Sequence, residues 1–145
     1  MDLALTTRWN ASRHTSGEKM IEEILSLGFS RVELGYDLRL DLVPGVTRMV
    51  KDRAVRVDSL HNFCPVPVAA VKGHPETYTP ADPDPRIREN AVQYTSQTLR
   101  FAAEVGAKVI VVHAGHVTMP RLTRELWALH EAGKQSSELF EKTRL

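Results

Sequence analysis

The stretch that decides the fold is DPRIRENAVQYTSQTLRFAAEVGAKVIVVH, residues 84–113. Its first part predicts a helix, because Asp84 can cap the N-terminus, Pro85 suits the first helical position and Gly106 can end the helix. The run 109–113 that follows is a strand-length segment, apolar on both faces until its final histidine. A helix joined to such a strand is typical of a parallel sheet covered by helices. The expected buried stripe of the helix consists of Ile87, Ala91, Tyr94, Thr98, Phe101, Ala102 and Val105.

The same alternation fills the residues before this stretch. We expect a capping box in which Glu18 reaches back toward Thr15 and begins a helix that ends at Gly28. The sequence therefore predicts an α/β fold with four strand–helix units. The other predicted strands lie at 3–7, 29–34 and 55–61, and the other predicted helices at 16–27 and about 42–53.

Two further segments complete the chain. Residues 62–84, after the third strand, form a long loop with five prolines, which we interpret either as a lid or as a plain surface excursion. From Arg121 onward the pattern is helical and shows no fifth strand. Gly133 interrupts the pattern, and Ser136 or Ser137 can cap a further helix. A leucine stripe in this part is expected to be core: Leu122, Leu126 and Leu129.

Composition excludes several classes of protein. The chain has 145 residues, 42% of them hydrophobic, and 19 basic against 18 acidic side chains, a formal charge of +1. These values exclude a disordered chain and make nucleic acid an unfavoured partner. The longest apolar run, 109–112, is too short to cross a membrane, and no secretory apolar region follows the N-terminus. The single cysteine, Cys64, excludes an internal disulfide and is expected to be a small buried residue. We expect one cytoplasmic domain over 1–145.

Several catalytic motifs are missing from the sequence. It contains no G-x-G-x-x-G, no G-x-x-x-x-G-K-[ST], no G-x-S-x-G and no paired C-x-x-C. Dinucleotide binding by that fingerprint, P-loop phosphoryl transfer and nucleophile-elbow hydrolysis are therefore not supported.

Polar side chains instead gather where the predicted strands end. The carboxyl ends of parallel strands meet at one rim, so these side chains should converge there. We predict catalytic roles for Glu33, His61 and His113, because imidazole binds oxygen or moves protons near neutral pH and a carboxylate can orient it. Satisfied structural roles are the alternative for each. Trp9, Asn10, Asn62 and His116 are the predicted substrate-binding residues, whereas His14, His74 and His130 are expected at the surface.

In order, the motifs VEL at 32–34, SLH at 59–61 and VVHAGH at 111–116 resemble the xylose isomerase-like (β/α)8 barrels. This superfamily includes sugar phosphate isomerases and epimerases and the endonuclease-IV type of apurinic endonuclease. The resemblance implies that Glu33, His61 and His113 line the pocket at the top of a barrel. It also implies a divalent metal (Mn²⁺, Mg²⁺, Co²⁺ or Zn²⁺) and a sugar or sugar phosphate as substrate.

The chain departs from that family in its number of strands. Such a barrel needs about 250 residues and eight strands, whereas this sequence predicts four, so it resembles the N-terminal half of a barrel. The resemblance implies that the family's metal carboxylates belong to strands beyond the fourth, so no metal site is assigned to this sequence.

Three hypotheses follow. The first is a sugar isomerase or epimerase that transfers a proton next to a carbonyl with the help of a metal. The second is a zinc-dependent apurinic endonuclease, with His61 and His113 on the zinc. The third is a non-catalytic half-barrel that forms a homodimer through its free edge strands.

Overall fold

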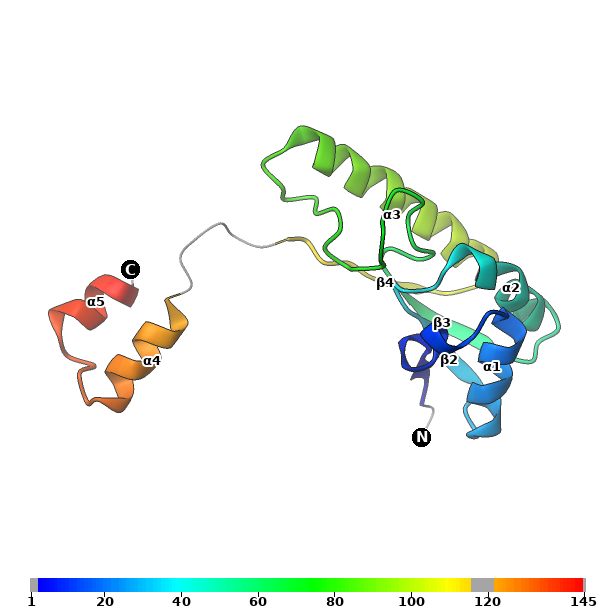
Figure 1. Cartoon of the computed structure of the whole chain (residues 1–145), viewed down its shortest axis with the longest axis horizontal. Helices are drawn as coiled ribbons and strands as arrows, with labels where there is room; N and C mark the ends of the chain where they lie inside the picture. Colours follow the sequence, from blue (N-terminus) through cyan, green and yellow to red (C-terminus); the bar gives the residue numbers. More distant parts are fainter. Residues whose placement is uncertain (1–2, 116–121, 145) are drawn as a thin grey trace. The chain divides into compact units, whose positions relative to one another are not determined.

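The computed structural model describes residues 3–115 and 122–144. The chain divides into two compact units, Met1–Gly115 and His116–Leu145. The first unit holds the sheet and the helices α1 to α3, and the second holds two short helices (Figure 1). That residues 1–145 form a single domain stays a prediction.

The sheet has four parallel strands in the order β1-β2-β3-β4, which confirms the predicted α/β class. Each strand is shorter than expected. The register between β2 and β3 shifts after Val32, because Val32 pairs with Val57 while Glu33 pairs with Ser59. Asp58 is thus an extra residue in β3, and its insertion places Glu33 beside Ser59 rather than beside Asp58. The strands are β1 Leu5–Thr6, β2 Arg31–Leu34, β3 Arg56–His61 and β4 Val109–Val111.

The main helices of the first unit agree with the predicted periodicity. Asp84 caps α3 by accepting a hydrogen bond from the backbone N–H of Arg86, and Gly106 ends the helix at a φ of 73°. The expected capping box at Thr15 is wrong, because the side chain of Ser16 caps α1 by accepting from the N–H of Lys19. The helices are α1 Gly17–Ser26, α2 Val43–Lys51 and α3 Pro85–Val105, with short 3-10 turns η1 Thr7–Trp9, η2 Ala11–Arg13 and η3 Leu40–Leu42.

The hydrophobic core lies between the sheet and the helices. α1 contacts α2, α2 contacts α3, and α3 contacts β3 and β4, so the three helices cover one face of the sheet (Figure 1). Each fully buried Leu, Ile or Val contributes about 1.5–3 kcal/mol relative to exposure. The core residues with no exposed surface include Met20, Ile21, Ile24, Val32, Leu34, Leu42, Val46 and Leu60.

The opposite face of the sheet carries the polar strand residues and is open. Successive side chains of a strand point to opposite faces, and Ile110 packs against the core while its neighbours Val109 and Val111 are 56% and 36% exposed. Through the strand pairings, Val109 lies beside Ser59 and Val111 beside His61. The strand β4 is apolar on both faces, as its sequence indicates, but one of these faces is exposed. In a closed barrel this face is the packed interior, and the four described strands leave it uncovered.

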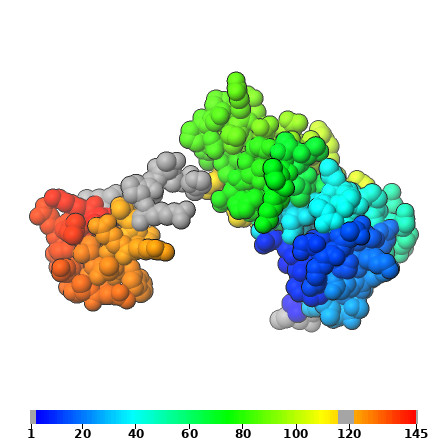
Figure 2. Space-filling view, viewed as in Figure 1, coloured from blue at the N-terminus to red at the C-terminus, as the bar shows by residue number. Residues whose placement is uncertain are grey.

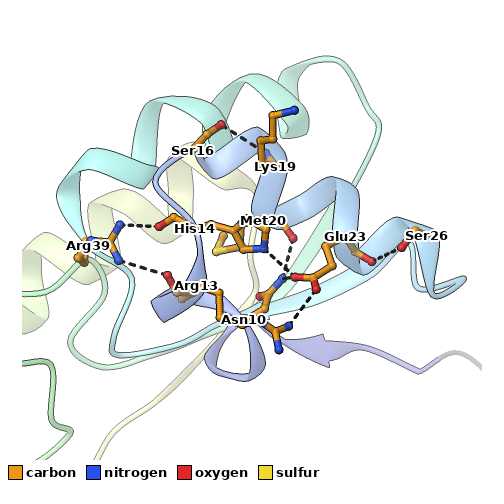
Figure 3. Close-up of polar contacts among 10 residues, drawn as sticks. Asn10, Arg13, His14, Ser16, Lys19, Met20, Glu23, Ser26 and Arg39 are labelled. Carbon is orange, nitrogen blue, oxygen red and sulfur yellow. Dashed lines mark hydrogen bonds and ion pairs between the residues drawn. The ribbon is translucent and has the colours of Figure 1, made fainter.

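A polar cluster holds the segment after β1 against α1 (Figure 3). The side-chain amide of Asn10, which is fully buried, donates to the carbonyl of Met20 and to Glu23 at 2.9 Å each. His14 donates from Nε2 to Glu23 at 2.6 Å, and Arg13 donates to the same carboxylate at 3.0 Å. His14 is thus half-buried and hydrogen-bonded, so its assignment to the surface is wrong. The cluster fixes the chain where it leaves the first strand.

Glu23 makes the stability of this cluster depend on pH. Hydrogen bonds from His14, then from Asn10, lower the pKa of Glu23 from 4.5 to about 2. Because the carboxyl has the lower pKa in the folded state, its contribution is complete above about pH 4.5 and is lost as the pH falls toward 2. We expect the free energy of unfolding of the wild type to decrease more steeply over this interval than that of Glu23→Gln, as measured by urea unfolding. Glu22→Gln, at an exposed position of the same helix, should keep the wild-type slope. Equal slopes for wild type and Glu23→Gln would contradict this role.

The second unit consists of α4 Thr123–Glu131 and α5 Glu138–Arg144. Ser137 accepts a hydrogen bond from the N–H of Phe140, as expected for a helix that begins there. Neither helix contains a buried residue. The leucine stripe at 122, 126 and 129 is therefore half-buried, and its assignment to the core is wrong.

Candidate active site at the carboxyl ends of the strands

Three strand-end side chains converge on the open face. The Nε2 atoms of His61 and His113 are 3.2 Å apart, and the two rings are tilted by 39°. Glu33 lies on the other side of His61, with its Oε1 4.0 Å from His61 Nδ1. The strands β2 and β3 supply Glu33 and His61, and His113 follows β4. The convergence arises because parallel strands place their carboxyl ends at one rim.

His61 lies in a partly enclosed position, with 18% of its side chain exposed. The ring of Tyr36 meets it edge-on at a centroid distance of 5.0 Å. Burial lowers the pKa of His61; the carboxylate of Glu33 opposes this shift, and the charges of His113 and Arg8 add to it. A histidine with a lowered pKa is neutral at pH 7. Such a ring offers one N–H donor and one lone pair to a substrate oxygen.

Glu33 is anchored by its neighbour in the sheet. Its Oε2 accepts a hydrogen bond from the hydroxyl of Ser59 at 3.2 Å, and Ser59 is its partner in the strand register. The inserted residue in β3 creates this pairing. The carboxylate therefore has a fixed orientation on the open face, and Ser59 is a site residue that the sequence reasoning missed.

Arg8 and Tyr36 form one wall of the site. The guanidinium carbon of Arg8 lies 4.1 Å from the centre of the Tyr36 ring, a cation–π contact. The aliphatic part of the Arg8 side chain lies against Gly35. A Cβ at position 35 would come within 2.3 Å of Cγ of Arg8. Gly35 thus leaves the space that brings the arginine to the ring. The sequence signal for this wall is Gly35 alone, which directly follows the VEL motif at 32–34.

The other wall of the site comes from residues 62–84, the Pro-rich loop. Glu76 Oε1 lies 3.4 Å from His113 Nδ1. Each histidine therefore has a carboxylate beside Nδ1, its outer nitrogen, which points away from the other ring. The sequence reasoning missed Glu76, because it lies in an aperiodic segment with no motif. His74, in the same loop, is exposed as expected and accepts a hydrogen bond from the N–H of Glu76.

The Pro-rich loop packs against the rest of the first unit (Figure 2), and backbone hydrogen bonds near both of its ends hold it there. The N–H of Val66 donates to Leu38, and the N–H of Ala81 donates to the carbonyl of Ala114. The ring of Tyr78 stacks on that of Tyr94 of α3 at 5.2 Å. The loop is therefore a wall beside the strand ends rather than an excursion away from them.

The predicted substrate-binding residues do not all lie at the site. Trp9 is 43% exposed, and the guanidinium of Arg13 covers its ring at 4.4 Å. The side-chain amide of Asn10 donates hydrogen bonds to Met20 and Glu23 of α1. Asn62 is buried and donates its amide to Thr95, while its Oδ1 has no hydrogen-bond partner. His116 lies outside the described residues.

Cys64 lies away from this chemistry. It is fully buried, as expected, and burial raises the pKa of its thiol well above the ordinary value. Its N–H donates to the hydroxyl of Thr98 at 3.1 Å. A protonated, enclosed thiol is a packing residue rather than a nucleophile.

The donor set does not fit a complete divalent-metal site. Over residues 3–115 and 122–144, no group of three or more His, Cys, Asp or Glu side chains is placed to hold an ion. The two histidine nitrogens alone leave a tetrahedral or octahedral ion without most of its ligands. These residues therefore do not complete a divalent-metal site by themselves.

Comparisons with known proteins identify the fold. Residues 21–144 match a family model described as a xylose isomerase-like TIM barrel. The structure is similar to the crystal structure of the apo form of 3-keto-D-glucoside 4-epimerase, YcjR, from E. coli, with a TM-score of 0.60 and 19% sequence identity. The match covers 99% of this chain and 53% of that one, so this chain spans about half of the epimerase's length. At this identity the likeness shows the fold alone. No curated protein matches the sequence. Among the described helices, none combines the length and apolar character that a membrane crossing requires.

Proposed function

The chain belongs to the xylose isomerase-like TIM-barrel family, and from this premise we propose that it binds a sugar for isomerisation or epimerisation next to the carbonyl. The observation that carries the proposal is the facing pair of Nε2 atoms, 3.2 Å apart, with a carboxylate beside each outer ring nitrogen. Side chains from β2, β3, the Pro-rich loop and the end of β4 create this arrangement on one open face.

The geometry suits the charge that this reaction develops. Removing a proton from the carbon next to a carbonyl places negative charge on the carbonyl oxygen, and preorganised N–H donors stabilise that charge. In the proposal, His61 and His113 hold the substrate oxygens through their ring nitrogens, and Glu33 accepts the proton from carbon on Oε1, the oxygen that Ser59 does not bind. Anchoring by Ser59 keeps that carboxylate in place.

A metal remains part of the family's chemistry. The family is generally metal-dependent, and a bound divalent ion polarises a carbonyl as a Lewis acid. The described residues do not complete such a site, so the proposal assigns the two histidines to substrate oxygens. The substrate panel below is therefore run with and without Mn²⁺, Mg²⁺ and Co²⁺.

Solvent hydrogen exchange tests the proposed reaction. The full chain is incubated in D₂O with a panel of ketoses and ketose phosphates, and deuterium at the carbons next to the carbonyl is measured by NMR. We expect exchange above the protein-free rate for at least one sugar, because the abstracted proton is replaced from solvent. No exchange across the whole panel, with or without the three metals, would overturn the proposed function.

A second candidate role is association through the open face. Val109 and Val111 lie exposed on this face, and β4 is an edge of the described sheet. Exposed edge strands with apolar side chains favour pairing with another chain. We propose a second copy of the chain as the partner, since two four-stranded sheets supply the eight strands of a closed barrel.

Sedimentation velocity of the full chain tests this association. We expect a dimer for the wild type and a monomer for Val111→Lys, because a buried ammonium group in the interface is costly. Val92→Lys, at an exposed position of α3, should remain dimeric. A wild type that is monomeric at every concentration would contradict the association.

A further inference from the structure

Glu76 is the one acidic side chain that the Pro-rich loop places against the histidine pair. Its Oε1 lies 3.4 Å from His113 Nδ1, and both side chains are partly exposed, at 39% and 38%. Catalytic hydrogen bonds are commonly long in structures without substrate and shorten in the complex. The contact therefore acts on the proton of the His113 ring.

An ionised carboxylate only accepts hydrogen bonds, so it selects the form of His113 that carries its proton on Nδ1. The Nε2 of that ring then has a free lone pair. It faces Nε2 of His61 at 3.2 Å, so it accepts a hydrogen bond if His61 carries its own proton on Nε2. The direction of the histidine–histidine hydrogen bond follows from the carboxylate.

The environment of His61 agrees with this direction. Its Nδ1 is 4.0 Å from Glu33, beyond hydrogen-bond distance, whereas Glu76 lies closer to His113. The other oxygen of Glu33, Oε2, accepts a hydrogen bond from the hydroxyl of Ser59. Burial lowers the pKa of His61, so this ring is neutral and carries one proton. That proton has an acceptor on the Nε2 side.

The backbone around Glu76 is held in place. Its own N–H donates to the ring of His74, and the N–H of Thr77 donates to the carbonyl of the same histidine. Gly115, which follows β4, adopts a φ of 121°. It lies so close to the loop that a Cβ at position 115 would come within 3.2 Å of Thr79. The loop and the end of β4 are thus packed together, which places the backbone of Glu76 beside His113.

We propose that Glu76 is a positioning residue that sets the tautomer of His113 and thereby the direction of the hydrogen bond between His61 and His113. A substrate that enters between the two rings replaces this hydrogen bond. The Nε2–H of His61 then donates to its carbonyl oxygen, and the Nε2 lone pair of His113 accepts from a sugar hydroxyl. This consequence for catalysis rests on the proposed function. The tautomer itself is a property of the free protein.

Imidazole ¹⁵N NMR of the full chain, without substrate, tests the proposal. At a pH where the rings are neutral, we expect His113 to carry its proton mainly on Nδ1 and His61 mainly on Nε2. In Glu76→Ala the hydrogen bond should reverse, so that the proton of His113 moves mainly to Nε2 and that of His61 mainly to Nδ1, on the side of Glu33. Glu76→Gln, which keeps an oxygen acceptor, should retain much of the wild-type arrangement. Glu89→Ala, at an exposed position of α3, should leave both rings unchanged. His113→Asn and His61→Asn assign the signals.

Two results would overturn the proposal. One is a wild-type His113 that carries its proton on Nε2; the other is a Glu76→Ala variant whose tautomers equal those of the wild type. Where a sugar shows exchange, Glu76→Ala should also lower the exchange rate by about 10- to 100-fold, the range found when the partner of a functional histidine is removed. The NMR readout needs no active substrate, so failure of the proposed reaction and failure of this assignment are separate outcomes.

Discussion

Replacing His61 with asparagine is expected to lower the rate of sugar deuterium exchange by about 10²- to 10³-fold. The substitution removes the imidazole that faces His113 at 3.2 Å and the donor proposed for the developing oxyanion. Loss of one such donor has an effect of this size in other enzymes. The measurement is the initial rate of exchange by the full chain with the sugar that the wild type processes fastest.

His130→Asn is the matched control for this substitution. His130 is exposed on α4 and has no part in the histidine pair, so its loss should leave the exchange rate unchanged. Circular dichroism must show that His61→Asn is folded before its rate is compared. A folded His61→Asn variant with the wild-type rate would contradict the role of this histidine.

Replacing Leu34 with alanine is expected to lower the free energy of unfolding by about 2–5 kcal/mol. Leu34 is in β2, has no exposed surface and pairs in register with the equally buried Leu60. Truncating it leaves a cavity between the sheet and the helices. Urea unfolding of the full chain, followed by circular dichroism, provides the measurement.

Leu40→Ala supplies the control for Leu34→Ala, since Leu40 is 50% exposed in η3. Surface substitutions of this kind stay within about 0.5 kcal/mol. Similar losses for both variants would mean that the buried layer around β2 does not dominate stability.

Local signals predicted the positions of the helices and of the four strands. Asp84, Pro85 and Gly106 mark the ends of α3 because caps and helix stops depend on the residues at those positions. The convergence of Glu33, His61 and His113 could also be predicted, since it follows from parallel strand ends alone. The capping of α1 differed by one residue, because Ser16 and Thr15 offer the same hydroxyl chemistry and only the backbone decides between them.

Features that depend on packing over long sequence distances could not be predicted in this way. Val109 and Val111 are apolar, but their exposure depends on how many strands surround them. Glu76 reaches His113 because the loop folds back, with Tyr78 stacked on Tyr94 and the N–H of Ala81 bonded to the carbonyl of Ala114. Nothing in the local pattern around Glu76 specifies that contact.

That a sugar binds at the histidine pair is a claim that imidazole NMR tests, through titration of the full chain with ketoses and ketose phosphates. We expect the ring signals of His61 and His113 to shift with a common saturation curve for at least one sugar, while those of His130 stay constant. Shifts confined to other histidines, or no shift at His61 and His113 for any sugar in the panel, would contradict the claim.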